Sequence, residues 1–436
     1  MPIKRMRGLA IERISFIFSV EKHIWKYRKC VKDYKLLKVD SIITRTKHKL
    51  LNLPRDFRLF LAATFVFGFS QSIVDSTFNN FLNETFLIDN LQRGLLELPR
   101  ELPGLLTIVV SAILFFLCSR RQAMVANILC AGGILFIGLF SPTFSVMLIW
   151  LFIFSIGQHL FIPLNQSIGM DLAVEGKTGK RLGQFSAVAN VAMIIGSFAV
   201  FIGFKYLNLN FKMSYVVACL GFFAVAVLIF MMKKDDPVPV RMKFQFRREY
   251  KLYYWLTILY GTRKQLFLTF APWVLVTIFQ QKTQILATLL TIGGVIGIFF
   301  KPMLGKAIDK LGERLILASE AAILIFVCMG YGFAKSVFPE TTAIYIVFAC
   351  YIVDQMLVAV SMARATYLQK IAVVPEDVSQ TLTMGVSIDH IFSIGIALLG
   401  GFVWVQWGYQ YVFMLGASIA VVNFFSALQI KTKFLK

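Results

Sequence analysis

The chain has 436 residues, of which 58% are hydrophobic and 16% are charged, and its formal net charge is +22. Soluble domains contain about 45–50% apolar and about 25% charged residues, so this composition excludes an ordinary soluble globule. The positive charge lies between long apolar stretches, which favours a membrane topology signal and excludes nucleic-acid binding as its explanation.

Residues 1–54 are expected to form a basic cytoplasmic tail. Their lysines and arginines are scattered, and no apolar stretch is followed by a small-residue cleavage site, so a cleaved secretory signal is not predicted. Two interpretations of the basic residues stay open. They contact anionic lipid headgroups, at about 1 kcal/mol per cation, or they act as topology signals alone.

Twelve apolar stretches follow, each close to the roughly 20 residues that a helix needs to cross a bilayer. Long continuous apolar runs favour helices over the alternating ten-residue strands of a barrel. The predicted fold is an all-α integral membrane protein with twelve transmembrane helices in two pseudo-symmetric six-helix bundles. The predicted spans are residues 57–82, 98–118, 123–140, 144–168, 182–204, 215–232, 253–279, 285–304, 315–333, 343–368, 382–405 and 411–428.

The basic residues also predict the orientation. Most of the 45 lysines and arginines fall on one side of the membrane when the N-terminus is placed in the cytoplasm. With an even number of spans, both termini are cytoplasmic. The predicted organisation is an N-terminal bundle at 55–232, a basic linker at 233–250, a C-terminal bundle at 251–430 and a C-terminal tail at 431–436.

The first span carries a polar stripe, because Gln71, Asp75, Asn79 and Asn83 recur every four residues. Ionisable groups at membrane depth cost several kcal/mol unless they face the interior of the bundle. Asp75 has no base within one helical turn, which makes it the best candidate for an acid that cycles a proton. The alternative is a carboxylate whose hydrogen bonds are satisfied by Asn79.

Other polar side chains lie in spans four, seven, ten and eleven. Two interpretations of the central acids and bases stay open, namely buried structural ion pairs and a path for substrate or protons. His159 is either a packing residue or a cavity residue. With the first span included, the candidate pathway residues are Asp75, Asn79, His159, Arg263, Lys264, Gln265, Asp354, Arg364, Asp389 and His390.

No metal site and no cofactor are predicted. The four histidines are scattered along the sequence, and no two of the six cysteines have the spacing of metal ligands or of a redox pair. No P-loop pattern is present, which argues against direct coupling to ATP hydrolysis within this chain.

The chain repeats itself. Residues 55–60 (RDFRLF) open the first span and residues 248–253 (REYKLY) open the seventh, and the same offset aligns Gly68 with Gly261. A second match aligns Asn190 with Asp389. Two halves of six spans each have the same orientation, which is the parallel type of repeat found in transporters with a solute path between the halves.

The loop between spans eight and nine contains Gly305, Asp309, Gly312 and Arg314 in the pattern G-x-x-x-D-(R/K)-x-G-x-(R/K). With the twelve spans and the repeat, this pattern resembles the major facilitator superfamily across residues 57–428. The resemblance implies that the loop is a cytoplasmic gate and that spans one, four, seven and ten line a central cavity. The equivalent loop of the first half, which begins at Cys118, lacks the glycine and the aspartate.

These observations predict a non-enzymatic secondary active transporter that moves a small organic solute across the plasma membrane by alternating access, coupled to protons through Asp75 or Asp389. The alternatives are a transporter-like sensor that signals through its tail and a lipid-handling membrane protein. The expected partners are the solute, protons and membrane lipids, without nucleic acid, and a monomer is expected. Arg263 and Lys264 favour an anionic solute. The three acids, Asp75, Asp354 and Asp389, favour a zwitterion or a neutral polar solute. Import and export are equally compatible with the sequence.

Overall fold

The computed structural model describes residues 53–114, 117–173, 178–233 and 247–431. The chain divides into two units, residues 1–58 and residues 59–436. The predictions for the basic N-terminal tail, for residues 432–436 and for most of the basic linker lie outside the described residues.

The helices from α2 to α8 are called the N-terminal half below. A π-helical turn, Leu82–Phe86, ends the first helix, and a capping box between Asp89 and Gln92 starts the short second one. Asn210 caps the last helix through its side chain. The half comprises α2 (Arg55–Phe81), α3 (Asn90–Leu95), α4 (Glu97–Ile113), α5 (Ser119–Leu139), α6 (Phe144–Asp171), α7 (Thr178–Tyr206) and α8 (Phe211–Phe230).

The helices from α9 to α14 are called the C-terminal half. A 3-10 turn, Arg248–Tyr250, precedes them. The half comprises α9 (Lys251–Thr277), α10 (Thr283–Val337), α11 (Glu340–Val358), α12 (Ser361–Ile371), α13 (Pro375–Trp407) and α14 (Tyr409–Leu428).

Every predicted span overlaps a helix, although the second extends beyond the end of α4 and the tenth is divided between α11 and α12, and the all-α membrane fold class is confirmed. By length and composition, nine of the described helices qualify as membrane spans, against twelve predicted. One reason is that α10 contains both the eighth and the ninth predicted span, joined at Gly312, whose φ of 79° and ψ of 160° are not helical. Another is that α4 has only 17 residues. The third is α9, the seventh predicted span, which is not among the nine.

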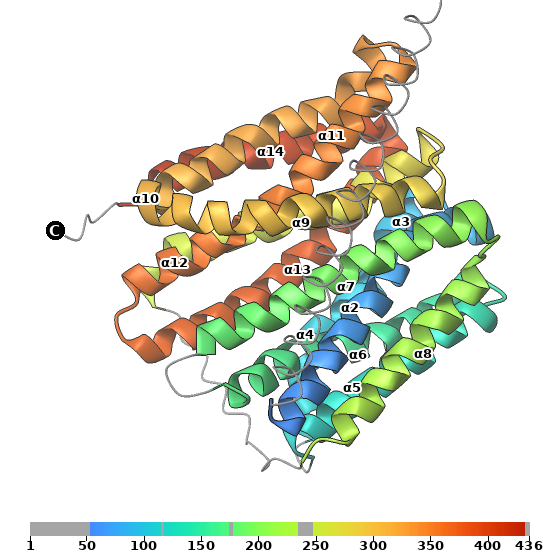
Figure 1. Cartoon of the computed structure of the whole chain (residues 1–436). Coiled ribbons are helices and arrows are strands. Elements are labelled where there is room, and N and C mark those ends of the chain that lie inside the picture. Colours follow the sequence, from blue (N-terminus) through green and yellow to red (C-terminus); the bar gives the residue numbers. More distant parts are fainter. Residues whose placement is uncertain (1–52, 115–116, 174–177, 234–246, 432–436) are drawn as a thin grey trace, which may run out of the picture. The chain divides into compact units, whose positions relative to one another are not determined.

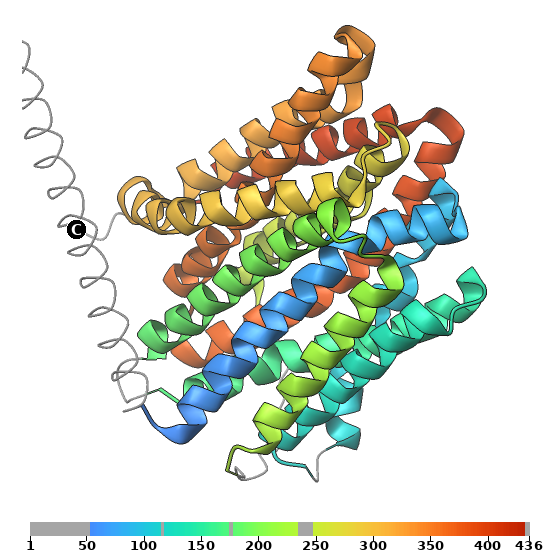
Figure 2. The ribbon, with the colours of Figure 1, turned by 45° about the vertical axis from the view of Figure 1, so that its right-hand side comes forward.

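Within each half, α5 packs closely with α6 and α8, and α10 packs closely with α11 and α14. Between the halves, α13 packs on α3 and α4, and α7 packs on α10 (Figures 1 and 2). Small residues permit the close approach of α3 and α13, because a Cβ at Gly94 would lie 2.5 Å from the carbonyl oxygen of Ala397. These helices therefore form the seam between the halves, with α10 and α13 on the C-terminal side.

Candidate solute pathway

A cavity of about 260 Å³ lies between the two halves. Its polar lining comes mostly from the N-terminal half, whereas the C-terminal half lines it mostly with apolar and aromatic side chains. The lining residues include Gln71, Asp75, Asn79, Arg100 and Gln158 on the first side and Leu268, Pro272, Leu290, Tyr351 and Gln355 on the second.

The polar wall is a hydrogen-bonded chain that joins α6 to α2. Gln158 Nε2 donates to Gln71 Oε1 at 2.5 Å, and Gln71 Nε2 donates to Asp75 Oδ1 at 2.9 Å. Asp75 also has a base nearby, which its neighbours in the sequence did not reveal. This base is Arg100 on α4, which lines the same cavity and whose positive charge acts on Asp75. The arrangement presents an acid, a base and two amides to the cavity.

Directly beside this wall, Glu97 fixes a buried network. Arg93 Nη1 lies 2.6 Å from Glu97 Oε1, both side chains are fully buried, and Arg93 Nε donates to Asn79 Oδ1 at 3.3 Å. Gln265 Nε2 donates to Glu97 Oε2 at 2.9 Å and so connects the two halves. Arg93 is fully buried, and Glu97, one helical turn on, neutralises its charge.

Three of the predicted central charges form a buried cluster within the C-terminal half. Arg263 Nη1 lies 2.8 Å from Asp354 Oδ1, and Arg263 Nη2 lies 3.2 Å from Glu320 Oε1. Arg364 Nη1 lies 3.4 Å from Glu320 Oε2 and stacks its guanidinium 3.5 Å from the ring centroid of Tyr260. None of these charged residues lines the cavity. Their pairing and burial favour the interpretation as structural ion pairs. The sequence did not predict Glu320, the acid that links the two arginines.

Lys264 and Asp389 form a separate, less buried pair. Lys264 Nζ lies 2.5 Å from Asp389 Oδ2, and the side chains are 20% and 15% exposed. The other oxygen, Oδ1, has no hydrogen-bond partner among the described residues. Gly261 permits this close approach of α9 and α13, because a Cβ there would overlap the Asp389 carboxylate.

Two histidines that are far apart in sequence meet in the seam. His390 Nδ1 on α13 lies 2.8 Å from Glu101 Oε2 on α4, and the ring centroids of His390 and His159 are 5.0 Å apart. Ser155 Oγ lies 3.0 Å from His159 Nδ1 and also donates to the backbone oxygen of Arg100. Because the four histidines are far apart in the sequence, no metal-binding group had been predicted. The structure corrects the premise of that prediction, because the ligand atoms of Glu101, His159 and His390 lie within 4.8 Å of one another.

The predicted gating loop lies in the turn of α10. Gly305 is helical, and Gly312 provides the non-helical residue of the turn. Asp309 and Arg314 are both exposed, and neither makes a hydrogen bond or ion pair with another described residue. Nearby, Lys370 Nζ on α12 lies 2.8 Å from Glu313 Oε1. In this conformation the predicted acid and base of the gate are not engaged.

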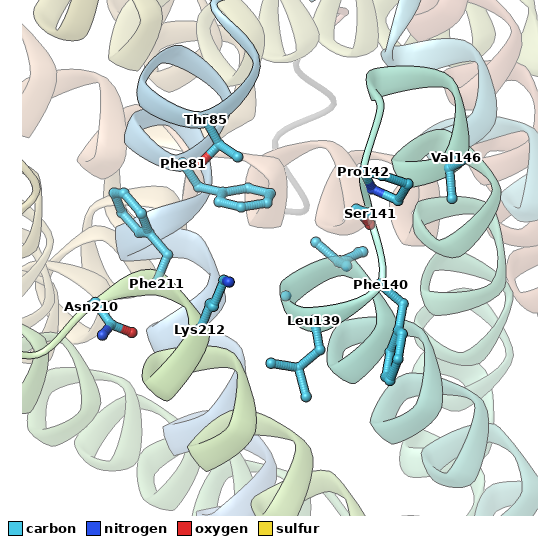
Figure 3. A pocket seen from close by; sticks show the side chains of 12 residues that line it. Phe81, Thr85, Leu139, Phe140, Ser141, Pro142, Val146, Asn210, Phe211 and Lys212 are labelled. Atoms are coloured by element: carbon cyan, nitrogen blue, oxygen red, sulfur yellow. The ribbon is translucent and has the colours of Figure 1, made fainter.

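A larger pocket, of about 970 Å³, lies at one end of the N-terminal half (Figure 3). Phe81, Leu139, Phe140 and Phe211 line it, and Lys212 is its only charged lining residue among those described. Because this pocket is lined by one half alone, the smaller cavity between the halves is the better candidate for a solute path.

The family model of the Major Facilitator Superfamily matches residues 60–387. Solved structures of transporters are similar in fold. A point mutant of the nucleoside transporter NupG has a TM-score of 0.71 at 12% identity, covering 86% of this chain and 100% of that one. A D-xylose–proton symporter has a TM-score of 0.65 at 13% identity, covering 87% and 98%. A POT family transporter in complex with 5-aminolevulinic acid has a TM-score of 0.68 at 13% identity, covering 88% and 97%. No curated protein sequence matches the chain.

Proposed function

The chain belongs to the Major Facilitator Superfamily, and on that premise we propose that it is a secondary active transporter of a small polar organic solute, coupled to protons and working by alternating access in the plasma membrane. The observation that carries the proposal is the cavity between the halves, with Asp75, Arg100 and two glutamines on one wall.

The size and chemistry of the cavity favour a particular class of solute. Its volume of about 260 Å³ is below the roughly 300–1,000 Å³ of sites for drug-sized ligands, so the solute is small. The wall holds one acid and one base, and the base, Arg100, is also paired with Glu97 at 3.3 Å, so the wall has no unpaired excess of positive charge. The amides of Gln71 and Gln158 both donate and accept hydrogen bonds. A zwitterion or a neutral polar solute fits this wall better than a multivalent anion.

The case for an anionic solute had depended on Arg263 and Lys264. Arg263 faces two carboxylates in the buried cluster, and Lys264 is paired with Asp389. A cation that is already paired contributes little attraction to a further anion. The pairing therefore favours the zwitterionic or neutral alternative.

Asp75 is the proposed proton carrier. It lines the cavity and accepts one hydrogen bond from Gln71. A carboxylate that the cavity exposes to one side and then the other exchanges its proton with each compartment in turn. Protonation removes the charge that Arg100 attracts, so proton binding and solute binding at this wall are linked.

The test starts from purified protein and a panel of amino acids, nucleosides, sugars, short peptides and organic anions. We expect one polar, uncharged or zwitterionic class to raise the unfolding temperature, and Gln158→Ala to abolish that rise. Gln369→Ala, at an exposed position on α12, is the matched control and should retain it. Stabilisation by multivalent anions alone would contradict the proposed substrate class.

The solute identified in this way is then used in proteoliposomes. Asp75→Asn should abolish uptake driven by a pH gradient but retain exchange of labelled for unlabelled solute, because exchange needs no net proton movement. Glu340→Gln, an exposed carboxylate at the start of α11, should leave both unchanged. Solute binding without flux in the wild-type protein would contradict the transporter proposal and favour the sensor alternative.

A further inference from the structure

The seam between the halves contains a group of side chains that the transport cycle proposed above does not use. Glu101 belongs to α4 and His159 to α6, both in the N-terminal half, whereas His390 belongs to α13 in the C-terminal half. We propose that these three residues bind a divalent transition-metal ion, for which Zn²⁺ is the probe, and that the bound ion clamps the two halves together. Metal binding itself is independent of the proposed function, and only the clamp rests on it.

The donor set has the right chemistry. Two imidazoles and one carboxylate are ligands that Zn²⁺ accepts, and three protein ligands leave a fourth position for water. In a tetrahedral site with bonds of 2.0–2.1 Å the ligand atoms are about 3.3 Å apart. His390 Nδ1 and Glu101 Oε2 are 2.8 Å apart, and all three ligand atoms lie within 4.8 Å of one another. Small rotations of the side chains therefore complete the site.

The tautomer of His159 fits this role. Its Nδ1 lies 3.0 Å from the backbone oxygen of Ser155, which only accepts hydrogen bonds, so Nδ1 carries the proton. Nε2 then has its lone pair free for a metal. A metal-bound histidine usually donates its other ring nitrogen to a fixed acceptor in this way, which sets the orientation of the ring.

The surroundings hold the ring of His390 close against α4. A Cβ at Gly104 would lie 2.6 Å from the His390 ring, so glycine at this position gives the imidazole its place against α4. The side chains of His390 and Glu101 are mostly buried, with 12% and 11% of their surface exposed. The neighbouring cations, Arg100 and Lys264, form their ion pairs with Glu97 and Asp389.

The consequence follows from the position of the site. Alternating access requires α4 and α13 to change their relative position, because both belong to the seam. Coordination bonds from both helices to one ion oppose that movement. The bound ion stabilises the conformation described here and so inhibits transport.

The binding test uses untagged, full-length protein treated with EDTA, titrated with Zn²⁺ by calorimetry and with Co²⁺ by absorption spectroscopy. We expect one ion per chain and a tetrahedral Co²⁺ spectrum. His159→Asn and His390→Asn should each weaken binding at least about tenfold. The double variant His23→Asn/His48→Asn, which removes the remaining histidines of the chain, is the matched control and should bind as wild type. Binding that survives both seam variants, or that disappears in the control, would overturn the site.

A second measurement tests the clamp and detects misfolding. In EDTA, the seam variants should unfold within a few degrees of wild type, and only wild type should be stabilised by Zn²⁺. Zn²⁺ should inhibit exchange of the transported solute in wild-type proteoliposomes, EDTA should restore it, and His390→Asn should be insensitive. Tight binding without inhibition would overturn the clamp, while a protein that transports no solute yet binds Zn²⁺ would contradict the proposed function and leave the metal site intact.

Discussion

The two halves use their charged side chains differently. In the N-terminal half, Asp75 and Arg100 face the cavity between the halves. In the C-terminal half, Arg263 and Arg364 are buried and held by Asp354 and Glu320, away from the cavity. The N-terminal half also has a fully buried pair, Arg93 and Glu97, but none of the four charged residues of the C-terminal cluster lines the cavity. Position beside the cavity, and not charge alone, therefore distinguishes the residues proposed to contact the solute from those in buried ion pairs.

The largest expected effect is in the buried charge cluster of the C-terminal half. Arg263→Met leaves Asp354 without its base and Glu320 with only one, and breaking a buried ion pair on one side costs about 3–5 kcal/mol. We expect the free energy of unfolding to fall by that amount, measured by denaturant unfolding in detergent. Asp75→Asn, which retains the shape of a cavity residue, should cost less than about 1 kcal/mol. Equal losses in the two variants would erase the contrast between the halves.

An intermediate effect is expected at the seam. Gly94→Ala places a Cβ 2.5 Å from the carbonyl oxygen of Ala397, so α3 and α13 must move apart, at about 1–3 kcal/mol for overpacking. Gly132→Ala on α5 is the control, because its Cβ would meet no described atom within 4 Å. Thermal unfolding should separate the two. A variant at Gly94 as stable as its control would show that the seam is looser than the interior of either half.

The smallest effect is expected at the gating loop. Asp309 is exposed and makes no ion pair with a described residue, so Asp309→Asn should change the free energy of unfolding by less than about 0.5 kcal/mol. If the loop acts as a gate in another conformation, the same variant should nevertheless alter the rate of solute exchange. Exchange kinetics measured beside unfolding distinguish the two roles. An unchanged rate would remove Asp309 from the transport cycle.

The fold was largely predictable from the sequence. Each apolar stretch long enough to cross a bilayer overlaps a helix among the described residues, because such stretches have no other stable structure in lipid. The short helix α3 was missed, since its six residues include Gln92 and Arg93 and have no apolar period. The loop motif correctly indicated a turn at Gly312. The predicted loop between the two spans is shorter in the structure, where Gly312 is the non-helical residue within α10.

The candidate site was only partly predictable. The four-residue spacing in α2 correctly indicated that Gln71 and Asp75 share a face, and both line the cavity. The interval between two residues in the sequence does not indicate a contact between different helices. For this reason neither the pair of Glu320 with Arg263 nor the pair of Glu101 with His390 was predicted. Contacts of this kind depend on which helices pack together, and a single sequence does not record that.

The turn at Gly312 also limits how the chain can vary in length. Glu320 lies eight residues beyond it, on an uninterrupted helix that ends at Val337. Since an α-helix has 3.6 residues per turn, inserting or deleting one residue between them would rotate the rest of that helix by about 100°. Glu320 would then leave the cluster with Arg263 and Arg364. Homologues that keep this cluster should therefore contain no insertion or deletion between the turn and the acid.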